Sequence, residues 1–237
     1  MNIVWALCRK ELELYFLSPL AYAFLGGCGF LAGLFFYLGL GVSPEPNIRI
    51  MTINLSLSLL FVMPLLTMRQ FSEEQRRGTF EMLMTFPISS WSIVVGKWLA
   101  TVLLCILLLG CTLLFPVILT YFASPDWGAI MGAYVGLLLC SMSFISAGLF
   151  ASSLTDEPVT AGMGGILILV PFWLSGVLAD FVEGGTLQNL LQDMSFVQHL
   201  DACSKGLLDA TDITWFILFV LFFLLLTWHS VESRRWR

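Results

Sequence analysis

Few side chains in this sequence have the type and spacing that catalysis or metal binding requires. The two histidines, His199 and His229, lie in separate segments and belong to no HExxH motif, so we expect interface residues rather than ligands or catalysts. Lys97 follows Gly96, but the other positions of GxxxxGK[ST] do not match, so no P-loop is formed. The sequence therefore disfavours an enzyme, and we expect no catalytic residue, metal ligand or cofactor site in this chain.

The elements that hold these residues are long apolar helices. The chain is 58% apolar and 11% charged, with a mean hydropathy of +0.90, which is unlike a soluble domain. Runs able to cross a hydrocarbon core of about 30 Å occupy six segments: 20–41, 51–68, 92–122, 128–153, 159–178 and 213–231. We predict an all-α integral membrane protein with six transmembrane helices in one domain, residues 1–237. Its first span is retained rather than cleaved as a signal peptide.

Charged residues predict the orientation of these spans. No ionisable residue lies in the middle of a run, where ion-coupled carriers place such groups, so an ATP-independent carrier or channel is disfavoured. With both termini in the cytoplasm, nine of the eleven basic residues lie inside, and only Arg49 and Lys205 lie outside. The net charge of −5 comes mostly from the outer connections and indicates no nucleic-acid partner.

The six cysteines form no disulfide or metal pattern. No CxxC motif occurs, and four cysteines lie within apolar runs: Cys28, Cys105, Cys111 and Cys140. Cys8 lies on the cytoplasmic side, which leaves Cys203 as the single outer cysteine, without an outer partner. We expect small apolar filler residues, and we expect an impermeant thiol reagent to reach Cys203 from outside.

Residues 2–17 precede the first span and form an amphipathic pattern. Their polar residues share one narrow arc, while Glu11 falls on the apolar side and needs a partner. Because Ser18-Pro19 breaks the helix, we predict an interfacial helix in the membrane plane; an extension of the first span is the alternative. The start of the third run, with Lys97, is expected to protrude into the cytoplasm or the headgroup region.

Glycines and prolines predict close contacts and kinks within the bundle. GxxxG pairs let helix backbones approach closely in lipid, which indicates a packed bundle and is compatible with a dimer face. The pairs are Gly29 with Gly33 and Gly132 with Gly136. Kinks are expected at Pro64, Pro116 and Pro171.

Residues 179–212, between the fifth and sixth spans, are amphipathic rather than simply polar. One apolar stripe at helical spacing comprises Leu187, Leu190, Leu191 and Met194. A second comprises Phe196, Val197, Leu200, Cys203, Leu207 and Leu208. We predict two short helices that lie against the outer membrane surface or dip into it, because the segment is too short to bury a core of its own.

Residues 69–90 form the polar connection between the second and third spans. Arg76 and Arg77 followed by Gly78 are typical of a helix end. A second short helix is then indicated by a capping Thr79, an acidic first-turn residue Glu81, an apolar knob of Phe80, Leu83 and Met84, and a terminating Pro87. Ser89 or Ser90 can cap the third span. Such a helix, lying crosswise under the membrane, suits the docking of a cytosolic partner; an ordinary structured loop is the alternative.

This connection resembles the cytoplasmic loop of ABC-2 type transporter permeases. The shared motif is E-E-x-x-x-G-T-x-E-x-L-x-x-x-P-I-S, from Glu73 to Ser89. The stretch KELELYFLSPLAYAFL…LAGLFFYL, from Lys10 to Leu38, is similar to the gliding-motility-associated branch of these permeases, near the nitrous-oxide-reductase accessory permease. The resemblance covers nearly the whole chain, including the number of spans and the long fifth-to-sixth connection.

The resemblance implies that the short helix is a coupling helix seated in a cleft of a separate cytosolic ATPase, which binds ATP and magnesium. It assigns this contact to Glu74, Gly78, Thr79, Phe80, Glu81, Leu83, Met84 and Pro87. The outer segment corresponds to re-entrant helices that gate the exit path, with gate residues Leu187, Leu190, Leu191, Met194 and Leu200.

The resemblance also implies a half-transporter of a bacterial inner membrane. Two identical or paralogous copies would work with two ATPases to export or mechanically displace a substrate, whose identity the match does not imply. The other expected partners are membrane lipid and an accessory extracytoplasmic protein. A haem-exporter channel subunit has a similar loop, but the SPLAYAF start argues against it; an intramembrane enzyme is the remaining alternative.

Overall fold

The computed structural model describes residues 3–42, 48–78, 89–122, 126–182, 185–206 and 209–235, which contain helices and no strand. The helices are α1 (Ile3–Leu17), α2 (Pro19–Val42), α3 (Arg49–Thr67), α4 (Arg69–Arg76), α6 (Ser90–Thr112), α7 (Leu114–Phe122), α8 (Trp127–Leu154), α9 (Pro158–Phe181), α10 (Thr186–Asp193), α11 (Phe196–Ser204) and α12 (Ala210–Arg235).

Six helical stretches of the described residues have the length and composition to cross a membrane. They are Pro19–Leu40, Arg49–Arg76, Ser90–Tyr121, Trp127–Leu154, Pro158–Phe181 and Ala210–Arg234. Each corresponds to one of the six apolar runs of the sequence. The predicted all-α protein with six spanning helices is therefore confirmed.

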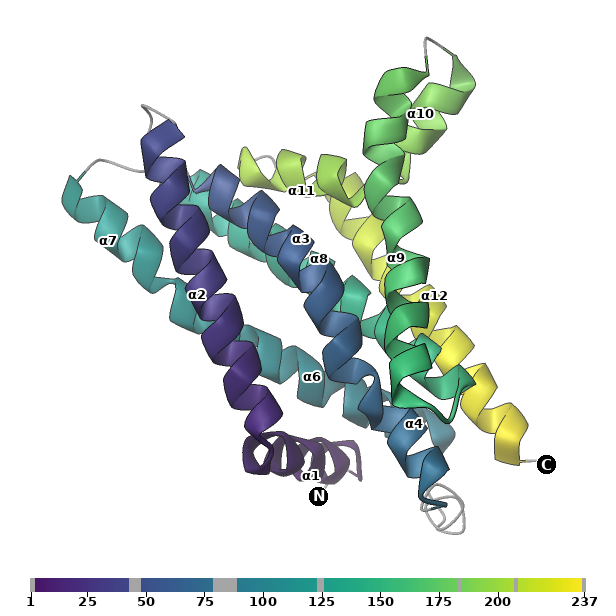
Figure 1. The fold of residues 1–237 in the computed structure, drawn as a ribbon. Coiled ribbons are helices and arrows are strands. Elements are labelled where there is room, and N and C mark those ends of the chain that lie inside the picture. The colour runs from purple at the N-terminus through teal and green to yellow at the C-terminus, as the bar shows by residue number, and fades with distance from the viewer. Residues whose placement is uncertain are drawn as a thin grey trace.

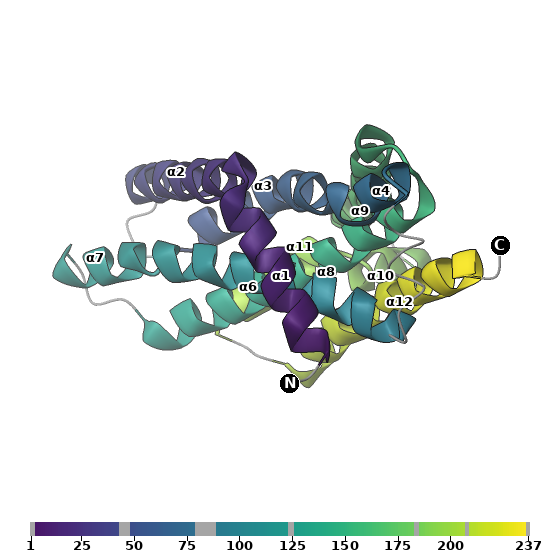
Figure 2. The same ribbon diagram turned by 90° about the horizontal axis from the view of Figure 1, so that it is seen from below.

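The spanning stretches run side by side between two ends of the molecule (Figure 1). α8 lies at the centre and packs against α3, α6, α9 and α12, while α2, α3 and α9 lie in a row when seen from below (Figure 2). We call the end that carries α1, α4 and both chain ends the α1 end, and the end that carries α10 and α11 the α11 end. α1 crosses beneath the bundle and packs against α6 and α2 (Figure 2).

Helix starts and stops follow local chemistry. The chain bends at Ser18, where α1 ends and α2 begins with Pro19, so the predicted break between the N-terminal helix and the first span is confirmed. Ser89 caps α6, as one of the two serines expected there, because its hydroxyl accepts the Ser92 N–H at 3.2 Å.

The third span is broken at Leu113, between α6 and α7. Pro116 has no N–H to donate to the carbonyl of Thr112, four residues earlier. The Tyr134 hydroxyl of α8 donates to that carbonyl instead, at 2.8 Å. The carbonyl that Pro116 leaves without its helical donor is therefore satisfied by Tyr134. α9, in contrast, continues through Pro171 without interruption.

Glycines bring α8 and α9 directly against the end of α3. A Cβ on Gly148 would lie 2.2 Å from Thr67 Oγ1 and 3.1 Å from Pro64 Cα, and one on Gly165 would lie 2.9 Å from Pro64 Cβ. α3 stops just beyond this contact, at Thr67, and α4 begins at Arg69. The end of the second span, where the 69–90 connection begins, therefore rests directly on the glycine backbone of α8 and α9.

The Gly132–Gly136 pair also packs within the chain. A Cβ on Gly132 would lie 2.4 Å from the carbonyl oxygen of Cys203, and one on Gly136 would lie 2.7 Å from Cys203 Cβ. This GxxxG therefore seats α11 on α8 and is not a dimer face. The pair in α2 differs, since a Cβ on Gly29 would meet nothing within 4 Å and one on Gly33 would meet only the Phe115 ring, at 3.3 Å.

Candidate functional site

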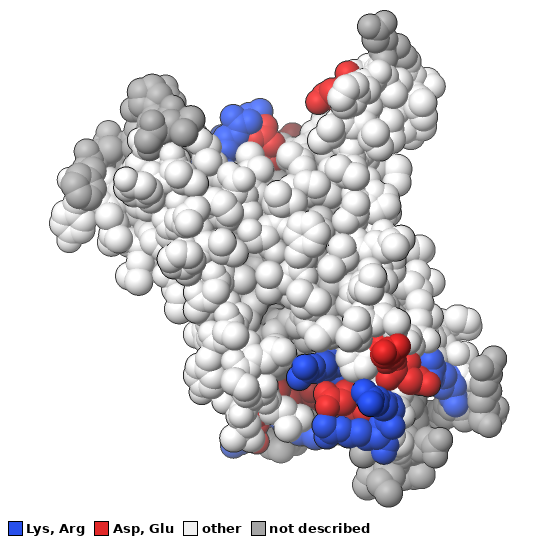
Figure 3. All heavy atoms as spheres, in the orientation of Figure 1, with Lys and Arg blue, Asp and Glu red and all other residues white. Residues whose placement is uncertain are grey.

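Charged side chains gather at the two ends of the bundle, and the face between them in Figure 3 shows neither acid nor base. The α1 end holds the larger group, contributed by α1, α4, the α8–α9 turn and the end of α12. The 69–90 connection also starts there. The α1 end is therefore the candidate functional site.

Lys97 of α6 lies at the centre of this end. Its Nζ donates to Glu11 Oε1 of α1 at 2.9 Å, to Glu74 Oε1 of α4 at 2.8 Å and to the carbonyl oxygen of Gln70 at 2.9 Å. Three acceptors match the three N–H groups of an ammonium. The side chains of Lys97 and Glu11 are only 3% and 9% exposed. We call these four residues the Lys97 cluster; it holds two carboxylates against one buried cation.

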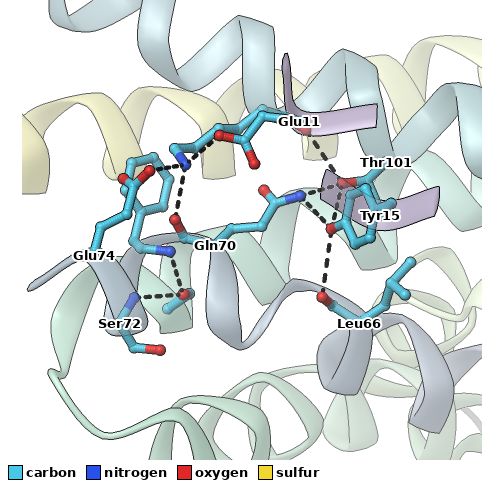
Figure 4. Close-up of polar contacts among 10 residues, drawn as sticks. Glu11, Tyr15, Leu66, Gln70, Ser72, Glu74 and Thr101 are labelled. Carbon is cyan, nitrogen blue, oxygen red and sulfur yellow. Dashed lines mark hydrogen bonds and ion pairs between the residues drawn. The ribbon is translucent and has the colours of Figure 1, made fainter. Parts of the chain in front are cut away.

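A second layer of hydrogen bonds extends the cluster (Figure 4). The Gln70 amide donates to the Tyr15 hydroxyl and to Thr101 Oγ1, each at 2.5 Å. Burial raises the pKa of the Tyr15 phenol, so this hydroxyl stays protonated and can donate to the Leu66 carbonyl at 3.5 Å. Gln70 Oε1 is buried without a hydrogen-bond partner among the described residues. α1, the α3–α4 junction and α6 are therefore joined by polar contacts at several points.

A hydroxyl of α8 satisfies the start of α4. Met68, the residue before α4, gives its first turn no side-chain cap. Ser152 Oγ of α8 instead accepts the N–H groups of Phe71 and Ser72, at 3.1 and 3.2 Å, and donates to the Met68 carbonyl at 2.8 Å. Free N–H groups at a helix start need such partners. The Ser152 contact therefore satisfies the start of α4 and fixes its position.

The end of α12 also contacts other elements at the α1 end. Arg234 Nη1 lies 3.1 Å from Asp156 Oδ1 in the α8–α9 turn, and its Nη2 donates to the Leu154 carbonyl at 2.9 Å. The Ser90 hydroxyl at the start of α6 donates to Glu232 of α12. The last helix is thus tied to both α6 and the α8–α9 turn.

A cleft of about 500 Å³ opens between α1, the start of α2 and the α3–α4 junction. Its lining residues are Lys10, Glu11, Leu14, Tyr15, Ser18, Leu20, Leu66, Arg69, Gln70, Glu73, Glu74, Arg77 and Lys97. The Lys97 cluster forms its polar wall. We call it the α1–α4 cleft.

The structure describes only part of the segment assigned to ATPase docking. Glu74 belongs to the Lys97 cluster, and Gly78 ends α4 with a φ of +69°, a backbone conformation that favours glycine. The remaining assigned residues lie outside the described part of the chain: Thr79, Phe80, Glu81, Leu83, Met84 and Pro87. Their role stays a prediction.

Lys97 is buried between two carboxylates at the α1 end, and protrusion of the start of the third run into the cytoplasm or headgroups stays a prediction. The signal for this contact in the sequence was Glu11, an acid on the apolar side of the first helix that needed a partner. Ser152 and Gln70 carried no such signal, because serine and glutamine are compatible with many environments.

At the α11 end, the assigned gate residues fall into two environments. Leu187, Leu190 and Met194 of α10 are exposed, Leu191 is half-buried, and Leu200 of α11 is fully buried. The two predicted helices are present as α10 and α11. Their apolar stripes differ, because α11 packs against α8, whereas α10 leaves its stripe on the surface.

Cys203 and His199 of α11 are both buried. Cys203 was expected to be accessible from outside, which is wrong, because it is 0% exposed, and burial raises the pKa of its thiol to about 11. His199 Nδ1 lies 2.6 Å from Asp212 Oδ1 and its Nε2 lies 2.9 Å from the Asp193 carbonyl, while its place at a membrane interface stays a prediction. Its ring stacks on Trp215 with 4.6 Å between ring centres. Both side chains hold α11 in place.

Comparison with known proteins places these features in a family. The family model described as ABC-2 family transporter protein matches residues 47–231. Two relatives, from Escherichia coli strain K12 and Escherichia coli O157:H7, are each named probable multidrug ABC transporter permease YbhR. Each is 25% identical over 178 residues, which cover 73% of this chain and 48% of the relative. The chain thus spans about half the length of the curated relatives it matches.

Proposed function

This chain belongs to the ABC-2 family of transporter proteins, and from that premise we propose that it is the membrane subunit of an ATP-binding cassette transporter. In this proposal a separate cytosolic ATPase binds ATP and magnesium and docks on the α1 end. ATP hydrolysis there drives export, or mechanical displacement of a substrate, through the spanning helices. The chain itself contributes no catalytic residue.

The distribution of basic residues supports a cytoplasmic α1 end. Among the described residues, Arg49 and Lys205 are the two basic residues of the α11 end, and the other lysines and arginines lie at the α1 end. Cytoplasmic connections of membrane proteins carry such an excess of lysine and arginine. In a bacterial inner membrane this orientation places both chain ends in the cytoplasm.

The Lys97 cluster is the observation that carries the coupling proposal. The 69–90 connection leaves the bundle through α4, which Lys97 joins to α1 and α6 and which Ser152 joins to α8. A push on residues 79–88 is therefore transmitted to several long helices rather than absorbed by a loose loop. A docking segment for a motor subunit requires such an attachment.

We assign the contact with the ATPase to the apolar residues Phe80, Leu83 and Met84, and a charge contact to Glu81. Leu83→Asp would bury an unpaired charge at that interface, at a cost of several kcal/mol. Glu81→Gln removes one partner of an ion pair with the ATPase, which costs about 2–5 kcal/mol. If Glu81 only stabilises a helix start, the loss is a few tenths to about 1 kcal/mol.

Further parts of the proposal concern assembly. A second copy of the chain, identical or paralogous, completes the transporter, and an accessory extracytoplasmic protein is a further candidate partner. The KELELYFLSPLAYAFL start supports a place in the gliding-motility-associated branch, near the nitrous-oxide-reductase accessory permease. We assign the gate of the exit path to α10 and α11, because α10 leaves its apolar stripe exposed at the outer end.

The test is reconstitution with the cytosolic ATPase that the proposal requires. Leu83→Asp is expected to insert in the membrane but to lose co-purification with the ATPase. The matched control is Leu187→Asp, which places the same charge on an exposed leucine of α10 and should leave co-purification unchanged. Glu81→Gln should still assemble, while ATP hydrolysis no longer responds to the membrane subunit. Full co-purification of Leu83→Asp would refute the docking assignment.

A further inference from the structure

The α1–α4 cleft contains two cations that have no acidic partner among the described residues. Arg77 lies at the cleft and pairs with Glu73 at 2.5 Å, and Lys97 is neutralised within its cluster. Lys10 and Arg69 also line the cleft and are exposed, and neither pairs with a carboxylate in the part of the chain that the structure describes. The lining therefore offers two cations, one from α1 and one from α4, to an anionic ligand.

Part of the cleft lining is apolar. Leu14, Leu20 and Leu66 line it. Beside it, Leu17 and Tyr22 are 82% and 61% exposed. Exposed apolar side chains next to free cations are expected where a helix lies at the boundary between headgroups and acyl chains.

We propose that the α1–α4 cleft binds one anionic phospholipid of the cytoplasmic leaflet. Its phosphate lies between Lys10 and Arg69, and its acyl chains run along Leu14, Leu20 and Leu66. This inference rests on the proposed function for one point only, the position of the α1 end at the cytoplasmic membrane surface. A volume of about 500 Å³ and an apolar wall exceed what a free phosphate ion needs.

A lipid in this position connects the same helices as the Lys97 cluster. Lys10 is on α1 and Arg69 is the first residue of α4, so a shared phosphate would join α1 to α4. Lys97 joins the same two helices through Glu11 and Glu74. Anionic lipid is therefore expected to stiffen the α1 end.

The test measures lipid binding directly and needs no ATPase. The full chain is purified in a neutral detergent, phosphatidylglycerol is titrated in, and retained lipid is counted by native mass spectrometry. The wild type is expected to retain one phosphatidylglycerol in preference to phosphatidylcholine. Lys10→Gln/Arg69→Gln is expected to bind it at least about tenfold more weakly, since each basic group near an anionic lipid contributes to the attraction.

The control is Arg9→Gln/Arg76→Gln, which removes one cation from α1 and one from α4 outside the cleft. It should retain the lipid as the wild type does. Equal loss in both double variants would mean general electrostatic attraction and would overturn the proposal, as would no loss in either. In a parallel arm, inorganic phosphate that displaces phosphatidylglycerol completely at millimolar concentration would identify a simple anion site and also overturn it. Binding that follows these expectations while ATPase coupling fails would separate this inference from the proposed function.

Discussion

Replacing Lys97 with methionine is expected to release α1 from the bundle. Methionine keeps an unbranched chain of similar length in the same space but removes the ammonium. The three acceptors that surround Lys97 Nζ, at 2.8 to 2.9 Å, would lose their donor together. Glu11 would then be an acid inside a protein contact with no counter-charge.

The magnitude follows from the burial of that carboxylate. The Glu11 side chain is 9% exposed and that of Glu74 is 22% exposed, so Glu74 is the easier of the two to hydrate. Removing one partner of a buried ion pair costs about 3–5 kcal/mol, most of it for the charge left behind. The double variant Lys97→Met/Glu11→Gln should recover a large part of this loss, because an amide carries no net charge into the site.

Hydrogen–deuterium exchange in lipid nanodiscs is the assay, read on the amides of α1 and alongside thermal unfolding. A loss of 3 kcal/mol or more corresponds to exchange faster by about a hundredfold, at 1.4 kcal/mol per factor of ten. The control is Arg9→Met, which breaks an exposed pair with Glu13 that contributes only about 0.3–0.5 kcal/mol. If Lys97→Met changes α1 exchange no more than Arg9→Met does, the cluster does not hold α1.

Two further predictions concern packing and access. Gly148→Ala is expected to destabilise the protein by about 1–3 kcal/mol or more in thermal unfolding, because the new methyl group overlaps the end of α3. Gly164→Ala, whose Cβ would lie at an ordinary 3.7 Å, should change little, and equal losses would contradict the close α3–α8 contact. Cys203 should resist an impermeant maleimide in intact spheroplasts and react faster only as pH rises toward 11, because the thiolate is the reactive form. Asn189→Cys, on the exposed face of α10, should be labelled readily, and its failure to react would count against an outer α11 end.

The features that the sequence predicts well are those set by nearby residues. Apolar runs identify the spans, Pro19 and Pro116 lie at the breaks, and Ser89 caps the helix that follows it. Helical periodicity alone also identified Glu11 as an acid on the apolar side of its helix. Each of these depends on residues within a few turns of one another.

The features that the sequence did not reveal are contacts between distant segments. Lys97 finds its carboxylates in α1 and α4, and nothing next to it in the sequence marks them. Cys203 lies on an apolar stripe of its segment, and it is covered because Gly132 and Gly136 leave room for α11 on α8. Whether a side chain is buried depends on the segment that packs against it, and only the fold determines which segment that is.

Under the proposed function we therefore expect the α1 end and the α11 end to respond differently to force. Lys97 joins α1 and α4 to α6, Ser152 joins α4 to α8, and Gly148 lets α3 lie directly on α8. Moving α4 by itself would separate Glu74 from Lys97 and leave two backbone N–H groups without partners, so under the proposed function we expect a displacement of residues 79–88 to move these long helices together. At the other end, none of the residues of α10, all of which the structure describes, is buried, and α10 packs mainly on α9. Under the proposed function we therefore expect motion carried along the helices to reach α10, which holds no buried residue.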